Sequence, residues 1–558
     1  MTKNTPPSLR KRYQKVIYTL FKYGFEDIVA HPPLNRLVPK SKRLIPQRDG
    51  KSVLSFTRYE RMRMVCEELG TTFIKFAQIA SNRPDLLPEE LIEEMVKFQD
   101  DALPVPVPTI KEILKEEYER PLEELFEEID YTPLASASMA QVHRARLIGG
   151  KEVVLKIQRP EIVDTIETDI IILKQLVRVI ENYFPHYASF QPMELVKMFE
   201  KSIHKELNFK LEMANLQQFQ SNFAGHEDIY TPRGFPEFST QRILCMEYID
   251  GVKITDLEAL AKIGLSGPDL ALKGINLYFI QVFDHGFFHA DPHPGNIFVL
   301  KNKDICFIDY GMMGQVVDSD KELLADLLLA VYDRDVDDLK RALLHFSWKE
   351  QQIDEKMLEY DIIEFFSNYS DITLESIDGN EIIAALNSLF FEYKIKVPSN
   401  MLLLLKALVI IEGVGLHLDP HYNIIKNIEP YVRRLVQQKY SPEKLSRNFI
   451  RTMGDTSQLL RELPDDLKAV VHKMKQGKLH IEFEHKGLEP LYKKMEIVSN
   501  RISFTLLLAA LIIGSSLMVI ADTPPHIYRI SVLGFAGFII SGLLALRLLY
   551  SIIRNGFF

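Results

Sequence analysis

Two short segments of this chain place three polar side chains in a spacing that few folds require. In the first segment, Asp291 and Asn296 enclose four residues. In the second, the apolar run Ile305–Ile308 ends at Asp309, which an aromatic residue and a glycine follow. Phosphoryl transfer needs an Asp that places the attacking group, and an Asn and a further Asp that hold magnesium ions. A chain with this ordered set must bring both segments to one site.

Asp-x-x-x-x-Asn followed by a strand-terminal Asp-aromatic-Gly is the order of a protein-kinase site, with Tyr310 here in place of Phe. Such a site also needs a strand Lys that reaches the phosphates and a helical Glu that orients this Lys. Lys156 lies on an apolar strand and fills the first role. Glu206 and Glu212 are both candidates for the second. They are six positions apart on one predicted helix, so they do not share quite the same face.

The segment that would cover the phosphates has an unusual composition. Where kinases have GxGxxG, this chain has alanines and serines and no glycine, and the proposed nucleotide-binding residues are Ala135, Ser136, Ala137, Ser138, Met139 and Ala140. Small side chains still allow close approach, and backbone N–H groups can still donate. Without glycine, positive φ angles become costly, so we expect a stiffer loop. After another apolar strand, Glu247 and Ile249 flank a predicted hinge that would hold adenine through backbone groups.

Bulk properties narrow the function classes. The chain has 558 residues and a formal net charge of −9, which argues against general nucleic-acid binding. Residues 1–50 carry a net charge of +8 and the remainder −17. Three cysteines lie far apart without a CxxC pair, which favours a reducing compartment and gives structural zinc no support.

The order of elements predicts an α+β, protein-kinase-like bilobal fold, with a small β-rich lobe before a large helical lobe. An N-terminal helical extension and a C-terminal transmembrane helical hairpin would flank it. The predicted domains are a basic amphipathic segment and linker (1–50), a helical extension (51–125), the β-rich lobe (126–250), the helical lobe (251–490) and two transmembrane helices (501–554).

Several elements carry specific expectations. Residues 57–100 predict two helices joined around 82–88, and 192–222 predict one long helix. The basic helix expected at 10–30 could lie on an anionic membrane surface or dock on the domain. Residues 32–50 are typical of a linker, and 320–475 predict a succession of amphipathic helices.

Two apolar segments near the C-terminus, Ile502–Ala521 and Ile530–Ile553, are each long enough to span a hydrocarbon layer. A short link with two prolines joins them. Lys493, Lys494 and Arg501 precede the first span and Arg554 follows the second, so the positive-inside tendency places both flanks on the cytoplasmic side. We therefore expect a multi-pass protein of the cell membrane with its kinase-like part in the cytoplasm. A hydrophobic helix pair buried in a soluble domain is the alternative.

From about residue 55 to its end, the chain resembles the UbiB family of atypical kinase-like proteins, which is linked with ubiquinone biosynthesis. The family's Lys-x-Gly-Gln motif corresponds to Lys75–Gln78. Its alanine-rich loop matches Ala135–Ala140, and its strand Lys matches Lys156. Its nucleotide and metal motifs match the Asp291, Asn296 and Asp309 set.

The resemblance also implies roles for individual residues. Glu212 would pair with Lys156, and the family's Glu-x-Asp motif falls on Glu206 and Asn208. The helix that carries Lys75 and Gln78 would fold over the active site and suppress protein phosphorylation. The resemblance further implies ATP and Mg²⁺ as cofactors and an ATPase-like activity coupled to lipid quinone precursors.

Two departures from the family bear on this regulatory arrangement. Ala77 stands where the family has glycine, which adds a methyl group to a closely packed helix. Asn208 replaces an aspartate, so an ion pair with Lys75 would be weaker at that point.

The sequence has its own argument against a peptide substrate. Only Met312–Asp318 separate the Asp-Tyr-Gly turn from a predicted helix at Asp320, and no Ala-Pro-Glu motif follows. We therefore expect a membrane-anchored, Mg²⁺-dependent ATPase of the UbiB type, with membrane lipids, quinone precursors and quinone-pathway enzymes as partners and no nucleic acid. The alternatives are a small-molecule or lipid phosphotransferase, and a nucleotide-gated lipid chaperone or scaffold with little turnover.

Overall fold

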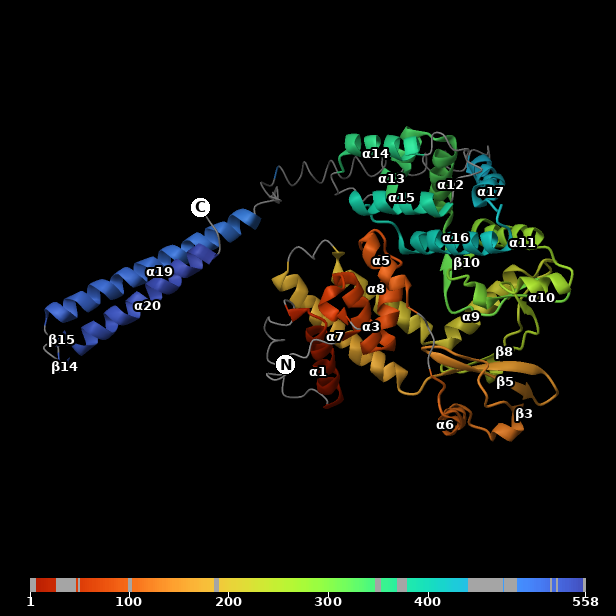
Figure 1. The fold of residues 1–558 in the computed structure, drawn as a ribbon, viewed down its shortest axis with the longest axis horizontal. Helices are drawn as coiled ribbons and strands as arrows, with labels where there is room; N and C mark the ends of the chain where they lie inside the picture. Colours follow the sequence, from red (N-terminus) through yellow and green to blue (C-terminus); the bar gives the residue numbers. More distant parts are fainter. Residues whose placement is uncertain are drawn as a thin grey trace. The chain divides into compact units, whose positions relative to one another are not determined.

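The structure is a computed structural model of the whole chain, which forms two compact units, Met1–Asn448 and Phe449–Phe558 (Figure 1). It describes residues 7–26, 47–48, 51–98, 103–184, 190–346, 353–368, 379–439, 475, 489–521, 524–527 and 530–554. The predicted linker at 32–50, apart from Gln47 and Arg48, lies outside the described residues, as does most of the predicted helical region beyond 439. The boundaries of the predicted domains stay predictions.

A five-stranded antiparallel sheet forms the small lobe of the first unit, in the order β3-β5-β6-β8 with β4 paired to β5. The strands are β3 (Phe126–Ile129), β4 (Ala135–Ser136), β5 (Ala140–Leu147), β6 (Glu152–Gln158) and β8 (Ile243–Glu247). Leu155 packs with α6 (Val107–Glu117) on one face, and Val154 packs with α9 (Phe209–Asn222) on the other. Because side chains alternate along a strand, Lys156 shares the α9 face with Val154.

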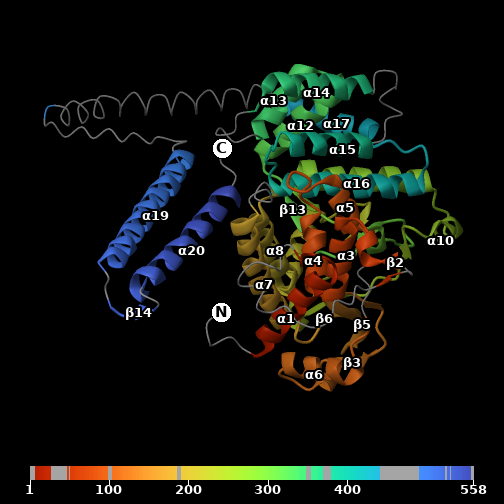
Figure 2. The ribbon, with the colours of Figure 1, turned by 60° about the vertical axis from the view of Figure 1, so that its left-hand side comes forward.

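Helices of the N-terminal extension pack with the two helices that follow β6, as both views of the ribbon show (Figures 1 and 2). They are α1 (Pro7–Lys22), α3 (Arg58–Leu69), α4 (Thr71–Ala80), α5 (Glu89–Val96), α7 (Ile162–Tyr183) and α8 (Pro192–Glu206). Their apolar faces share a buried core, so the extension is part of the first unit rather than a loose arm.

Two predicted continuous helices are each split, so the prediction was wrong at these points. Gly70 separates α3 from α4 with a φ of 93°, a conformation that glycine adopts at little cost. Asn208 separates α8 from α9, and its side chain accepts a hydrogen bond from the Lys210 N–H as an N-cap. Glu206 therefore ends one helix while Glu212 lies in the first turn of the next.

The basic N-terminal helix docks on the domain, which is one of its two predicted placements. Val16 and Ile17 of α1 are fully buried against α3 and α7. Arg12 makes a bidentate ion pair with Asp169 of α7, with both N–O distances at 2.7 Å. Since the apolar face is buried in protein, it is not available to a membrane surface.

The larger lobe is mostly helical and contains two small sheets, β10-β13 and β7-β12-β11-β9. Its strands are β7 (Ile229–Tyr230), β9 (Val252–Lys253), β10 (Phe287–His289), β11 (Ile297–Val299), β12 (Ile305–Phe307) and β13 (Met313–Gln315). Its helices are α10 (Leu257–Lys262), α11 (Gly267–Phe279), α12 (Asp318–Asp333), α13 (Val336–Phe346), α14 (Glu355–Asn368), α15 (Gly379–Glu392), α16 (Ser399–Leu418) and α17 (Ile424–Lys439). The predicted kinase-like bilobal α+β fold is confirmed.

One apolar helix of this lobe, α16, is long enough to cross a membrane by length and composition. However, 61% of its apolar window is buried inside the protein, and it contacts α11, α15 and β13. It is therefore a core helix of the large lobe.

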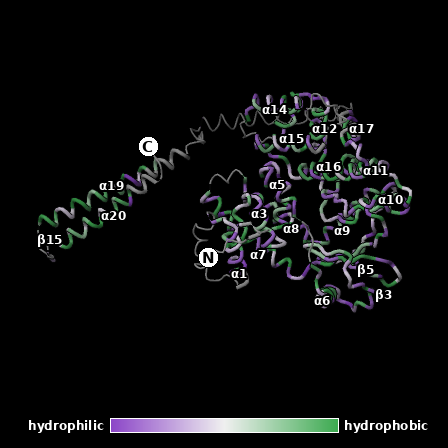
Figure 3. Tube along the Cα trace, viewed as in Figure 1, coloured by the Kyte–Doolittle hydropathy of each residue, from purple (hydrophilic) through white to green (hydrophobic). Residues whose placement is uncertain are grey.

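The second unit is a helical hairpin of α19 (Glu489–Ile520) and α20 (Val532–Arg554), joined through the short pair β14 (His526–Ile527) and β15 (Ile530–Ser531). Figure 3 shows hydrophobic residues along both helices. Within Val498–Ile520, which is long and apolar enough to cross a membrane, only 6% of the apolar window is buried; Val532–Leu548 is a shorter apolar helix. Within this unit the apolar side chains face outward, unlike those of a buried helix pair.

Candidate active site

Lys156 and Glu212 form an ion pair between the sheet and α9. The Lys156 Nζ lies 2.8 Å and 3.0 Å from the two carboxylate oxygens of Glu212, and the Glu212 side chain is only 5% exposed. The alternation of β6 and the N-cap at Asn208 together bring these groups face to face. The structure thus pairs Lys156 with Glu212, as the family resemblance implied, rather than with Glu206.

Asp309 completes a three-membered charge cluster with this pair. Its Oδ2 lies 3.5 Å from the Lys156 Nζ, and its Oδ1 accepts a hydrogen bond of 2.8 Å from the Gly311 N–H. A Cβ atom at Gly311 would lie 3.2 Å from Asp309 Oδ1, closer than most Cβ contacts. A larger residue at this position would therefore require the Asp309 carboxylate to shift slightly.

Charge and burial set the protonation states in this cluster. Burial alone would lower the pKa of Lys156, but the surrounding carboxylates, chiefly Asp309 and Glu212, raise it above its ordinary value. Burial would raise the pKa of Asp309, but the Lys156 ammonium and the Gly311 N–H lower it to about 2. Asp309 is therefore ionised at physiological pH, and its side chain, 38% exposed, remains accessible.

Tyr310 anchors the turn behind the charged residues. It is 1% exposed, its ring packs edge-on against Phe219 of α9 at a centroid distance of 5.2 Å, and its hydroxyl donates to the Phe307 carbonyl. The Asn215 side chain, also on α9, donates to the Tyr310 carbonyl at 2.9 Å. These contacts tie the Asp309 turn to the helix that carries Glu212.

His289 joins the two motif segments. Its Nε2 lies 2.7 Å from the carbonyl oxygen of Asp309, and its Nδ1 lies 3.2 Å from the backbone N of Asp291. The carbonyl can only accept, so Nε2 carries the proton and Nδ1 accepts. Burial lowers the pKa of His289, which keeps the ring neutral and suited to this bridge. These two contacts hold the Asp309 turn and the Asp291 loop together.

Asn296 lies beside Asp309 across a strand pair. Its carbonyl accepts a hydrogen bond of 3.1 Å from the Ile308 N–H, and Ile297 is in register with Phe307. The two predicted metal residues are therefore neighbours at one end of the β11–β12 pair. Asp291 precedes Asn296 in the same loop, and its side chain is 43% exposed.

The donor set of these residues fits Mg²⁺. An ionised carboxylate and an amide oxygen are hard ligands, and Mg²⁺ usually completes its octahedron with water and phosphate oxygens. Across the part of the chain that the structure describes, no group of three or more His, Cys, Asp and Glu side chains is arranged to hold a metal ion. A site of one or two protein oxygens plus phosphate is thus the kind that these residues can offer.

The alanine-rich loop is a tight, braced turn. Ala135 and Ser136 pair with β5, and the Ala137 N–H donates to the Ala140 carbonyl. Arg159 donates to the Ala137 carbonyl at 2.8 Å and to Ser136 Oγ at 2.9 Å. These hydrogen bonds brace the loop, and the stiffness expected from the absence of glycine stays a prediction.

Two further residues of this loop point to different roles. Met139 is buried in the core that α4 and α7 share. The Ser138 side chain is 7% exposed, and its Oγ has no hydrogen-bond partner among the described residues. A buried hydroxyl without a partner costs free energy, which an oxygen of a bound nucleotide would recover. This observation fits a nucleotide site.

The predicted hinge follows β8. The Glu247 carboxylate accepts hydrogen bonds from the Tyr230 hydroxyl and the Arg233 N–H, so this side chain braces the strand. The Tyr248 N–H donates to the Glu152 carbonyl. By contrast, the N–H and C=O of Ile249 bond to no other described residue. Ile249 therefore has the free backbone groups that an adenine would need.

The helix α4, which carries Lys75 and Gln78, meets the end of α8. Lys75 Nζ lies 2.9 Å from Glu206 Oε1, with side chains 15% and 34% exposed. Glu206 also contributes to the raised pKa of Lys156, so the Lys75 pair borders the charge cluster. Gln78 is half-buried on the same helix, and its carbonyl accepts a hydrogen bond from Ser81 Oγ.

The two departures from the family pattern have structural explanations. Ala77 is fully buried among Leu86, Leu91 and other apolar side chains, so its methyl group contributes to the packing of α4. Asn208 acts as the N-cap of α9, a role that an aspartate would fill equally well. The substitution therefore keeps the helix start while it removes one charge.

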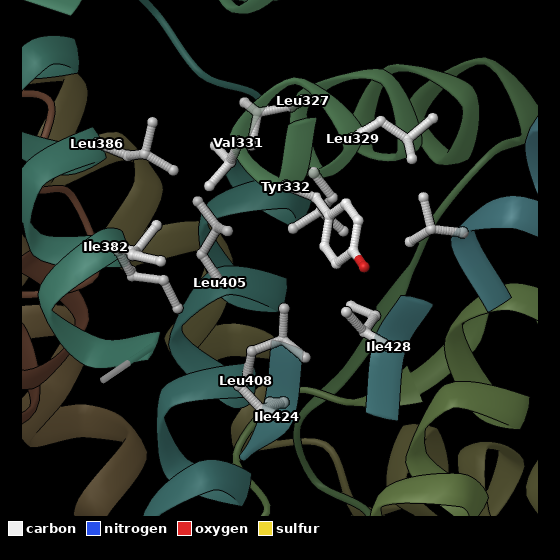
Figure 4. A pocket seen from close by; sticks show the side chains of 13 residues that line it. Leu327, Leu329, Val331, Tyr332, Ile382, Leu386, Leu405, Leu408, Ile424 and Ile428 are labelled. Carbon is white, nitrogen blue, oxygen red and sulfur yellow. The ribbon is translucent and has the colours of Figure 1, made fainter. Parts of the chain in front are cut away.

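The segment after the Asp-Tyr-Gly turn is as short as predicted. Residues 313–315 form β13, which pairs with β10 in the large lobe, and α12 begins at Asp318 rather than Asp320. No extended loop intervenes that could dock a peptide. The pocket of about 70 Å³ in Figure 4, lined by α12, α15, α16 and α17, has only apolar side chains and Tyr332, so it offers no group for phosphate or metal chemistry.

Sequence reasoning missed four residues of this site: Asn215, Arg159, Lys406 and the bridging role of His289. Lys406 of α16 lies 3.8 Å from Asp291 Oδ1. His289, two positions before Asp291, was visible in the sequence, but its contact with the Asp309 carbonyl depends on how β10 and β12 are placed. The others come from distant segments and carry no motif.

Family models match three parts of the chain. The ABC1 atypical kinase-like domain matches residues 97–343, the UbiB helical domain matches 362–423, and the ABC1/UbiB kinase-like C-terminal domain matches 486–554. The first match contains the whole set from Lys156 to Asp309, and the last contains the α19–α20 hairpin.

Curated relatives span most of the chain. A Clostridium pasteurianum protein, "Uncharacterized protein in hydrogenase 1 5'region", is 34% identical over 89% of this chain and 93% of its own length. Proteins named "Probable protein kinase UbiB" from Pseudomonas aeruginosa and Shewanella loihica are each 31% identical, over 82% and 91% of this chain and 87% and 92% of their own lengths. A solved structure, the complex of Rv3197 with erythromycin from Mycobacterium tuberculosis, is 21% identical with a TM-score of 0.38, over 58% of this chain and 89% of that chain, and this likeness is too low to bear on function. Matches of this extent show that the chain belongs to the ABC1/UbiB family of atypical kinase-like proteins.

Proposed function

We propose that this chain is a Mg²⁺-dependent ATPase of the UbiB type that a C-terminal hairpin anchors in the membrane. Lys156, held by Glu212, would bind the α- and β-phosphates, and Asp309 and Asn296 would hold Mg²⁺. Asp291 would place the attacking water. Bound Mg²⁺ neutralises charge on the phosphate oxygens, which is the main catalytic requirement of phosphoryl transfer.

The single observation that carries this proposal is the assembled ion pair between Lys156 and Glu212 with Asp309 beside it. A buried Lys–Glu pair alone contributes weakly to stability, because desolvation offsets much of its Coulomb energy. Its position against the ionised Asp309 has a clear use in an enzyme that orients phosphates and metal. Perturbed groups that cluster in this way are more frequent at functional sites than elsewhere.

Water or a membrane lipid is a better acceptor here than a peptide. The segment between Gly311 and α12 is short and paired in β13. The Lys75–Glu206 ion pair holds α4 beside the charge cluster. Both features limit the space for a polypeptide substrate.

The hairpin supports a membrane setting. Its apolar side chains face outward within the second unit. Exposure of these side chains to water would cost a large free energy, and a surrounding lipid bilayer removes that cost. Lys493, Lys494, Arg501 and Arg554 flank the apolar stretches, which favours a cytoplasmic kinase-like part. Family membership then implies action on or near isoprenoid quinone precursors, in support of ubiquinone biosynthesis and beside the enzymes of that pathway.

The test is phosphate release by the purified full chain in nanodiscs, with and without a quinone-precursor mimic, for the wild type and Asp309→Asn. We expect release that the lipid mimic stimulates and that Asp309→Asn reduces about 100-fold or more, since a metal ligand supplies several kcal/mol of transition-state stabilisation. Asp164→Asn, on the exposed surface of α7, is the matched control and should leave the rate unchanged.

Other outcomes identify the alternatives. A phosphorylated lipid or small molecule in the mass spectrum would identify a phosphotransferase. Nucleotide-dependent lipid binding with almost no release would identify a lipid chaperone or scaffold. Wild-type release that persists in Asp309→Asn would contradict both enzymatic functions.

A further inference from the structure

The helical lobe places a cation at the reacting end of the proposed site. Lys406 Nζ, on α16, lies 3.8 Å from Asp291 Oδ1. Asp291 is the residue that would place the attacking group, so a cation beside it is at the terminal phosphate rather than at the adenine. No other described Lys or Arg forms an ion pair with Asp291.

The local chain cannot supply this charge itself. The loop from Asp291 to Asn296 contains no Lys or Arg, and neither does Met312–Val317 after the Asp-Tyr-Gly turn. Lys156 forms ion pairs with Glu212 and Asp309 and is the proposed ligand of the α- and β-phosphates. A side-chain cation at the terminal phosphate, in addition to Mg²⁺, would therefore come from another segment.

Lys406 also stands out on its own helix. From Asn400 to Ile411 it is the only charged residue, and its neighbours Leu405 and Ala407 are buried. The packing of α16 against α11, α15 and β13 fixes where this side chain emerges. Lys406 and Asp291 are 36% and 43% exposed, so both reach the same accessible space. An ion pair this exposed contributes little to stability, and the ammonium can exchange the carboxylate for a phosphate at little cost.

We propose that Lys406 binds the terminal phosphate of ATP and is a further active-site residue of this chain. The inference rests on the proposed ATPase function and adds a residue from the UbiB helical domain to it. In hydrolysis, the water oxygen bonds to the γ-phosphorus while the bond to the β–γ bridging oxygen breaks. ADP leaves with the electron pair, and the water proton passes to Asp291 or to solvent. Lys406 would neutralise charge on the transferred group throughout this step.

The test compares a non-hydrolysable ATP analogue with ADP, each with Mg²⁺, for binding to the full chain in nanodiscs. A charge-assisted hydrogen bond to the terminal phosphate predicts that Lys406→Met weakens the ATP analogue about 10- to 100-fold. The ADP affinity should stay within about twofold, because ADP lacks that phosphate. Lys406→Arg keeps the charge and should restore most of the lost affinity. Lys356→Met, on the exposed surface of α14, is the matched control.

Retained ADP affinity shows that the variant is folded; if Lys406→Met does not bind ADP, the more polar Lys406→Gln takes its place in the same comparison. Equal losses for both nucleotides in that second variant, or no loss for the ATP analogue, would overturn the proposal. Faster turnover without Lys406 would also overturn it, because the lysine would then restrain Asp291 instead of binding phosphate. If the wild type binds neither nucleotide, it is the proposed ATPase function that fails.

Discussion

Replacement of Glu212 by Gln removes one charge of the central ion pair and keeps the side-chain shape. At the observed 2.8 Å, the Coulomb attraction between Lys156 and Glu212 is about 6 kcal/mol for an effective dielectric constant near 20. Desolvation offsets much of this energy, and Asp309 remains 3.5 Å from the ammonium. We therefore expect a net loss of about 1–3 kcal/mol in the positioning of Lys156.

This loss should appear mainly in catalysis. A displaced Lys156 weakens a charge-assisted contact with phosphate, so kcat/KM for ATP should fall about 10- to 100-fold in Glu212→Gln. The assay is phosphate release by the full chain in nanodiscs across a range of ATP concentrations. Glu200→Gln is a matched control, because Glu200 pairs with Lys174 at 2.6 Å but both side chains are about 30% exposed.

A double-mutant cycle tests whether Glu212 acts through Lys156. If Glu212 acts through Lys156, then Lys156→Met combined with Glu212→Gln should be no worse than Lys156→Met alone. Additive losses would show that the two residues act independently. An unchanged kcat/KM in Glu212→Gln would show that the pair has no part in turnover.

Three further predictions concern stability. Burial lowers the pKa of His143, so the unfolded state binds a proton more readily than the folded state. The free energy of unfolding should therefore be highest above pH ~6.5 and should fall as the pH drops below that value. Melting temperatures measured from pH 8 to 5 should show this decrease for the wild type and a smaller one for His143→Asn. Arg12→Gln leaves a buried carboxylate without its cation and should destabilise the docking of α1 by about 3 kcal/mol, seen as ~100-fold faster hydrogen exchange in α1, whereas Lys15→Gln on the exposed face should have no such effect. In the hairpin, a side chain at Gly537 of α20 would overlap Ser515 of α19, so Gly537→Val should lower the melting temperature of the hairpin. Gly542→Val should leave it unchanged, because no atom lies within 4 Å of a Cβ built at Gly542.

Much of the candidate site was predictable because its residues lie in short, ordered motifs. A short loop separates Asp291 from Asn296, and the β11–β12 hairpin separates Asn296 from Asp309, so their proximity follows from local geometry. Lys156 was identifiable because one charge interrupts an apolar strand. The hairpin was identifiable because long uncharged stretches are rare outside membranes and cores.

The partner of Lys156 could not be derived from spacing alone. The sequence predicted Glu206 and Glu212 on one helix, and only the break at Asn208 placed them on separate helices with different partners. The placement of α1 was open for a similar reason, since a basic amphipathic helix suits a lipid surface and a protein core equally well. The burial of Val16 and the Arg12–Asp169 pair decided it.

The sequence by itself determined the lobe order, the candidate phosphate and metal motifs and the apolar hairpin, because each depends on residues close together in the chain. Tertiary structure decided which carboxylate meets Lys156, how His289 joins the two motif segments, and that Lys406 comes from α16 to Asp291. These contacts join residues that are far apart in the chain. They depend on helix breaks and on the packing of buried faces, which residue patterns restrict but do not specify.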